Sequence, residues 1–105
     1  MAITNVMVES TQTTTVFTSP SEVAVTTMFF CNQSATEDCL IDIFLVPAGF
    51  PLSTSTQIIK ALDLPSTETF VFDAEKLILE LGDKIYSIAT VDKIVAATIS
   101  YVQTS

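Results

Sequence analysis

Carboxylates are the side chains of this sequence that could most readily take part in chemistry. Paired carboxylates can bind calcium or act as general acid and base across a cleft. The candidate groupings are Glu37-Asp38, Asp73 with Glu75, Glu80 with Asp83, and Asp92. None has the spacing of an EF-hand calcium loop, and acids in turns ordinarily favour tight backbone conformations and hydration. We therefore expect no catalytic residue and no metal site among them.

The two cysteines, Cys31 and Cys39, are the remaining candidates for reactive or cross-linking chemistry. Paired strands would bring their backbones close enough for a disulfide, but intracellular synthesis favours free, partly buried thiols. Two cysteines without any histidine are too few for a structural zinc site. Asn32-Gln33-Ser34 matches the glycosylation pattern, which has meaning only in a secreted protein. We expect neither a catalytic cysteine nor a cofactor.

Several residue types that chemistry commonly needs are missing from the 105-residue chain. It has 12 acids against 4 lysines, a formal charge of -8, and no histidine, arginine or tryptophan. Histidine is the commonest general base, and arginine is the usual clamp for phosphate, so the composition argues against an enzyme. Scattered single lysines argue against a nucleic-acid partner and against an anionic membrane surface.

The length fits one domain, and the N-terminus carries no signal-peptide pattern. No apolar run approaches a membrane span. We expect synthesis inside the cell, with residues 1–12 forming an N-terminal arm or edge strand and residues 13–105 a sandwich domain. The chain is 49% hydrophobic and only 15% charged, which favours a surface that is buried in an assembly.

An all-β fold must position these side chains. Thr and Ser make up 26 residues and Val and Ile another 20, and only two glycines occur. This composition, with turn residues at regular intervals, predicts a single antiparallel β-sandwich, jelly-roll-like, of about eight strands. The expected segments are 13–18, 22–31, 39–46, 57–64, 68–73, 76–81, 84–90 and 93–103. A helix in 53–60 or 72–81 is the less favoured alternative, with Asp73 as its cap.

The polar loop between Cys31 and Cys39 predicts a hairpin. In that register Phe29 would pair with Ile41, and the apolar face through Val25, Phe29 and Cys31 would lie in the core. The opposite face would carry Phe30 beside Leu40, and it is too apolar for open solvent. Either the N-terminal segment or a neighbouring subunit would then cover it. The candidate interface residues are Met28, Phe30, Phe44, Val46 and Phe50.

Phe50 lies between Gly49 and Pro51 in a short loop. It could tuck back over one end of the sandwich or project as an anchor for a partner. The tucked position is favoured.

Three segments carry a resemblance to a known family. They are Thr15-Val-Phe-Thr-Ser-Pro20, the run from Val23 to Asn32, and the run from Glu75 to Ile85. Together they resemble the small virion structural proteins of tailed bacteriophages, in which a TVYTSP opening leads into an apolar strand and a KLVLEAGD stretch precedes the last strands. The family often has a glycine soon after the first proline and in a Pro-Ala-Gly-Glu turn. Here Pro20-Ser21-Glu22 and Pro65-Ser66-Thr67-Glu68 stand in those places.

The resemblance implies a β-sandwich without catalysis that assembles on the virion, most simply as a capsid decoration or cement protein. It would bind the shell through an apolar sheet face or its N-terminal arm. The expected partners are other virion proteins, namely major capsid or tail subunits, and further copies in a homo-oligomer. The alternatives are a neck, tail, baseplate or fibre component, or a free-standing jelly-roll module that binds a ligand.

Overall fold

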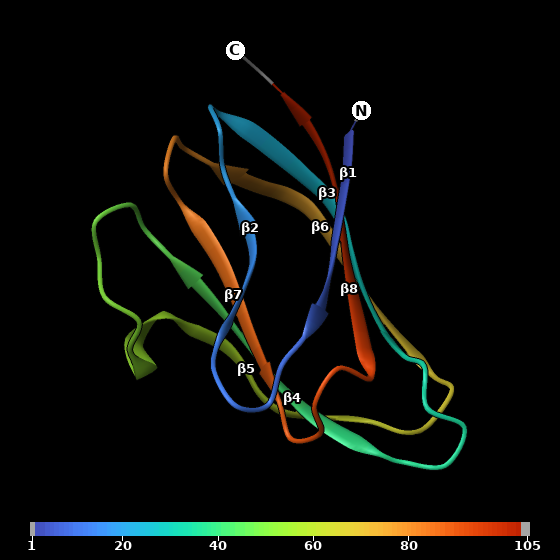
Figure 1. Ribbon diagram of the computed structural model, residues 1–105. Coiled ribbons are helices and arrows are strands. Elements are labelled where there is room, and N and C mark those ends of the chain that lie inside the picture. Colours follow the sequence, from blue (N-terminus) through green and yellow to red (C-terminus); the bar gives the residue numbers. More distant parts are fainter. Residues whose placement is uncertain (1, 104–105) are drawn as a thin grey trace.

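Two antiparallel four-stranded sheets form the protein. The structure is a computed structural model that describes residues 2–103, except for the side chains of residues 2, 54 and 73–76. The strands are β1 (Ala2–Val8), β2 (Thr14–Thr18), β3 (Val23–Asn32), β4 (Cys39–Val46), β5 (Gln57–Leu64), β6 (Thr69–Leu79), β7 (Lys84–Ala89) and β8 (Val95–Gln103), and a short 3₁₀ turn, η1 (Thr54–Thr56), precedes β5. The sheets pack as the two layers of a sandwich (Figure 1), which confirms the predicted all-β fold.

The chain passes back and forth between the two sheets. The first sheet has the order β1-β8-β3-β6 and the second has the order β2-β7-β4-β5. Within residues 2–103, every connection except β4–β5 therefore crosses from one layer to the other. Because consecutive strands mostly do not pair, the neighbours of each strand come from distant parts of the sequence.

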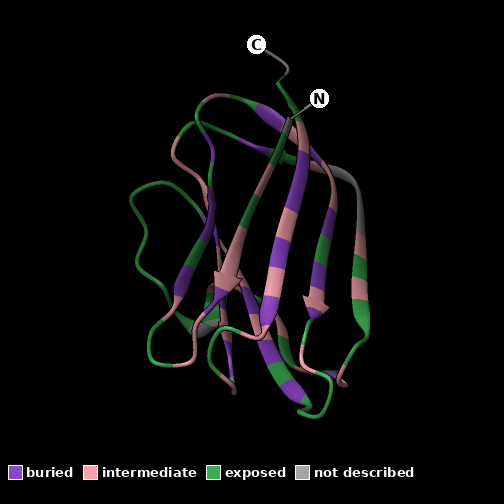
Figure 2. Cartoon of the chain, turned by 45° about the vertical axis from the view of Figure 1, so that its right-hand side comes forward, coloured by how far each residue is buried: buried purple, intermediate pink, exposed green. Residues whose placement is uncertain are grey.

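The core lies between the layers and consists of alternate residues of each strand. Fully buried side chains from both sheets meet there, among them Val25, Ile41, Ile43, Ile85 and Ile99. The alternation is visible along the strands of the first sheet (Figure 2), where buried positions are separated by half-buried or exposed ones. This period of two is the one expected for strands that have one face in a core and one face outside it.

The hairpin predicted between Cys31 and Cys39 is wrong. β3 pairs with β6 and β8, whereas β4 pairs with β5 and β7 in the other sheet. The polar loop from Gln33 to Asp38 crosses between the layers instead of turning back within one sheet. Both cysteines are free, with Cys39 buried and Cys31 half-buried.

The assignment of faces on β3 is also wrong beyond Val25. The pairing of β3 with both neighbours shifts between Val25 and Thr27, which indicates a bulge. A bulge inserts one residue and so reverses which side chains face the core. Met28 and Phe30 are consequently buried in the core, while Phe29 points outward and is exposed.

Residues 69–79 form the single strand β6, so the preferred strand is confirmed over the alternative helix, and the two expected strands are one. The proposed helix cap, Asp73, has a side chain outside the described residues. Leu79 is buried, whereas Leu81 lies beyond the end of the strand and is exposed.

The N-terminal segment is an edge strand. β1 pairs with β8 over its whole length, from Ala2 opposite Tyr101 to Val8 opposite Val95. Val8 is fully buried, so this segment contributes to the sandwich core. Within residues 2–103, no helix has the length and apolar character that a membrane span requires.

Candidate interaction surface

The outer face of the first sheet is the most distinctive surface of the molecule. Residues opposite one another on neighbouring strands share a face, and the register places Asn5, Thr98, Phe29 and Val71 in one row across all four strands. Phe29 is 37% exposed and Val71 is 52% exposed, although both are large and apolar. This row crosses the middle of the sheet.

Parallel rows extend the same surface in both directions. Met7, Ala96, Cys31 and Thr69 form one row, and Val102, Ala24 and Ile78 form another. The fourth row, between the Asn5 row and the Val102 row, runs through Ile3, Ser100 and Thr27 to Asp73 on β6, whose side chain lies outside the described residues. Thr26 Oγ1 donates a hydrogen bond to Ser100 Oγ at 3.1 Å. We call the surface made by these four rows the uncharged face, because none of its described side chains carries a charge.

The outer face of the second sheet is different. It carries the charged side chains Asp42, Lys60, Asp63 and Lys84 on β4, β5 and β7. The remaining described acids lie mostly in the loops at the two ends of the sandwich. In a protein with a net charge of -8, the described side chains of the uncharged face therefore add no charge that would oppose contact with another apolar surface.

A hollow lies on the β1–β8 side of the uncharged face. It is lined by Asn5, Val6, Met7, Gln33, Ala96 and Thr98 and has a volume of about 440 Å³. Small side chains at Ala96 and Thr98 form part of it. Phe29 projects beside it, because Phe29 lies opposite Thr98 on the neighbouring strand.

The predicted interface residues are not brought together. Met28, Phe30 and Val46 are buried in the core, so the prediction that they dock onto a partner is wrong. Phe44 is half-buried on the outer face of the second sheet, where it pairs with Tyr86. The residues that do face outward on the first sheet were missed. The alternation of inward and outward side chains along β3 could have indicated them, but the bulge in β3 reverses this alternation.

Phe50 projects from the loop between β4 and β5. Its side chain is 65% exposed, so the favoured expectation that it tucks over the sandwich is wrong. Phe50 N donates to Pro47 O at 3.0 Å, and Gly49 takes a φ of +79, as the third position of a type II turn requires. Asp83 Oδ1 holds the base of this loop by accepting a hydrogen bond from Ala48 N at 2.9 Å.

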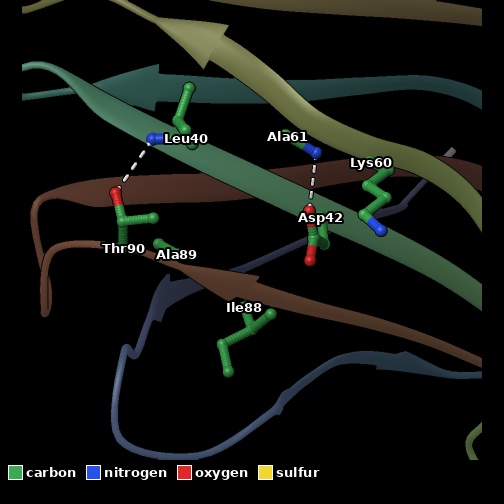
Figure 3. A pocket seen from close by; sticks show the side chains of 7 residues that line it. All are labelled: Leu40, Asp42, Lys60, Ala61, Ile88, Ala89 and Thr90. Carbon is green, nitrogen blue, oxygen red and sulfur yellow. Dashed lines mark hydrogen bonds between the residues drawn. The ribbon is translucent and has the colours of Figure 1, made fainter.

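A second hollow, on the outer face of the second sheet, is lined by Leu40, Asp42, Lys60, Ala61, Ile88, Ala89 and Thr90 (Figure 3) and has a volume of about 270 Å³. The Asp42 carboxylate and the Thr90 hydroxyl in it hold the backbone. Asp42 Oδ1 accepts a hydrogen bond from Ala61 N at 2.7 Å, and Thr90 Oγ1 accepts one from Leu40 N at 3.0 Å. The carboxylate of this hollow therefore serves to hold neighbouring strands together.

The carboxylates considered from sequence mostly organise loops. Asp38 accepts a hydrogen bond from Ser66 N, Asp92 from Ser10 N, and Asp83 from both Ala48 N and Glu80 N. The side chains of Asp73 and Glu75 lie outside the described residues. Among the side chains that are described, no three histidine, cysteine or acidic groups come together as metal ligands would.

Asn32, the asparagine of the glycosylation pattern, is fully buried. Its Nδ2 donates to Glu37 O at 2.8 Å and to Leu64 O at 2.9 Å, and its Oδ1 accepts from Ser34 N at 2.9 Å. The amide nitrogen that a glycan would occupy is thus used within the folded domain. Every buried side-chain nitrogen and oxygen in the described part of the chain has a hydrogen-bond partner.

Comparisons of this chain with protein-family models, with curated protein sequences and with solved structures gave no match.

Proposed function

We propose that this protein is a non-enzymatic structural protein of a tailed-phage virion, in the role of a capsid decoration or cement protein. The observation that carries the proposal is the uncharged face of the first sheet, with Phe29, Val71 and Ile78 exposed on it. A surface of this kind suits burial against another protein subunit. The absence of histidine and arginine from the sequence supports a role without catalysis.

The resemblance of three segments to small virion proteins supports the virion as the place of assembly. The Pro65-to-Glu68 turn supports it further, because Thr67 adopts a φ of +67 where the family turn has glycine, and Glu68 N donates to Pro65 O at 3.1 Å. The turn that the glycine favours is thus retained with a different residue. The strand orders of the two sheets also support assigning the sandwich to the jelly-roll class.

The docking surface proposed here replaces the one expected from sequence. Phe29 and Val71 take the place of Met28 and Phe30, which are buried. β1 lies at the edge of the same sheet, so the sheet face and the N-terminal segment form one continuous surface. Many weak contacts between copies of the protein and the shell, repeated over a particle, would together strengthen the shell.

The experiment that tests the proposal is the copy number of the protein in purified particles of its source phage, measured by quantitative mass spectrometry against the major shell protein. Hundreds of copies, roughly one for each shell subunit or cluster of subunits, are the expected result. Six to a few tens of copies would assign it to the neck, tail, baseplate or fibre instead. Absence from the particle would overturn the virion role and favour the free-standing ligand-binding module.

A further inference from the structure

We propose that a second copy of this chain covers the uncharged face, so that two sandwiches pack face to face in a two-fold dimer. This inference rests on the proposed function and identifies the subunit that covers this surface as a second copy of the chain. Three observations carry it: the size of the face, its shape and the distribution of charge around it.

The size of the face is sufficient for a weak dimer. Strands in a sheet lie about 4.8 Å apart and rise about 3.3 Å per residue, so four strands of the length of β8, which has 9 residues, cover roughly 570 Å². Two such faces together give roughly 1,100 Å², which exceeds the roughly 1,000 Å² expected of a biological interface and falls below the roughly 1,200 Å² at which standard-size stable interfaces begin.

The shape of the face is complementary to itself. The exposed Phe29 and Val71 project from β3 and β6, and the hollow beside Ala96 and Thr98 lies on β1 and β8. A two-fold axis that runs parallel to the strands between β8 and β3 places β3 of one copy over β8 of the other. Since Phe29 and Thr98 are register partners, Phe29 then faces Thr98 and the hollow of the second copy. The same operation repeats the contact in the opposite direction, as an isologous interface requires.

The described charges favour self-association through this face over the outer face of the second sheet. Two copies that each carry a net charge of -8 repel one another. The second sheet carries Asp42 and Asp63 on its outer face, and the loop ends carry most of the other described acids. Packing through the uncharged face keeps these carboxylates at the periphery of the dimer, where they remain hydrated.

Sedimentation velocity of the purified protein tests this inference. We expect the wild-type chain to be a dimer at about 100 µM and Phe29→Glu to weaken the dimer at least about 100-fold, since each interface would bury two unpaired carboxylates. Val71→Glu should have the same effect. Ile58→Glu is the matched control, because Ile58 has a similar exposed fraction, 41%, but belongs to β5 of the other sheet. Circular dichroism would verify that each variant folds.

A mixing experiment tests the orientation of the two copies. Thr98→Lys and Phe29→Glu should each be monomeric alone, and an equimolar mixture should form a heterodimer, because the carboxylate introduced in one copy would then face the ammonium group introduced in the other. A mixture that stays monomeric would overturn this orientation. A wild-type chain that is monomeric or trimeric, or a dimer that Phe29→Glu leaves intact, would overturn the two-fold packing. If the wild type is monomeric and Phe29→Glu still prevents incorporation into particles, another virion protein covers the face, and the proposed function stands without the dimer.

Discussion

Asn32 joins two loops at one end of the sandwich. Its side chain donates to the main chain at the last residue of β5 and in the loop before β4, and its own backbone N donates to Glu68 O at 2.9 Å. Replacing Asn32 with alanine removes this buried side chain as the hydrogen-bond partner of two carbonyls and of the Ser34 amide. We expect Asn32→Ala to lower the free energy of unfolding by about 2–3 kcal/mol, measured by urea denaturation. Gln33→Ala, next to it and exposed, should change stability by less than about 0.5 kcal/mol; equal effects would contradict this account.

Thr67 is a residue at which the backbone is strained. A β-branched side chain is disfavoured at its φ of +67, whereas glycine adopts this conformation freely. We expect Thr67→Gly to raise the free energy of unfolding by about 0.5 kcal/mol, because relief of the strain outweighs the greater freedom of glycine in the unfolded chain. Ser66→Gly is the control, since Ser66 is not among the residues with positive φ and should lose stability. Thermal unfolding of both variants tests this prediction, and a loss of stability in Thr67→Gly would refute it.

At the scale of elements, β5 is an edge strand whose irregular pairing is held by a side chain. Its register with β4 shifts between Ile41 and Ile43, and Ala61 has a φ of +52 at that point. Asp42 accepts the amide hydrogen of Ala61. Bulges of this kind stop an edge from pairing with another chain. Asp42→Ala should therefore accelerate hydrogen exchange of the Ala61 amide and cost about 1 kcal/mol of stability. Asp63→Ala, on the same outer face, should leave that amide unchanged, and equal acceleration in both variants would argue against the role of Asp42.

The elements themselves were largely predictable, whereas their partners were not. Strand limits such as 39–46 and 57–64 match because runs of β-branched residues between turn signals depend only on local sequence. The pairing of β3 was missed because a polar loop of that length can turn back or cross to the other layer. The outward face of β3 was missed because no residue type marks the bulge after Val25. The candidate surface depends on both features, so it could be recognised only in the folded chain.

At the scale of the whole molecule, charge and apolar surface are separated. One broad side, the uncharged face, is made of the four strands that include both ends of the chain, as the register of Ala2 with Tyr101 shows. The opposite side and the loop ends carry the described acids that give the chain much of its net charge of -8. A dimer through the uncharged face would therefore combine short-range apolar attraction with long-range repulsion between the two copies.

These two contributions respond differently to salt, which gives the dimer a characteristic ionic-strength dependence. The Debye length falls from about 30 Å at 0.01 M to about 8 Å at 0.15 M, so added salt screens repulsion between the copies and leaves apolar contacts nearly unchanged. We expect dimerisation to tighten roughly tenfold or more over this range, measured by sedimentation equilibrium at constant pH. Phe29→Glu should stay monomeric at both salt concentrations, because screening does not remove the cost of burying its carboxylate. Weaker association at the higher salt would show instead that oppositely charged groups hold the two copies together, and the uncharged face would then not be the interface.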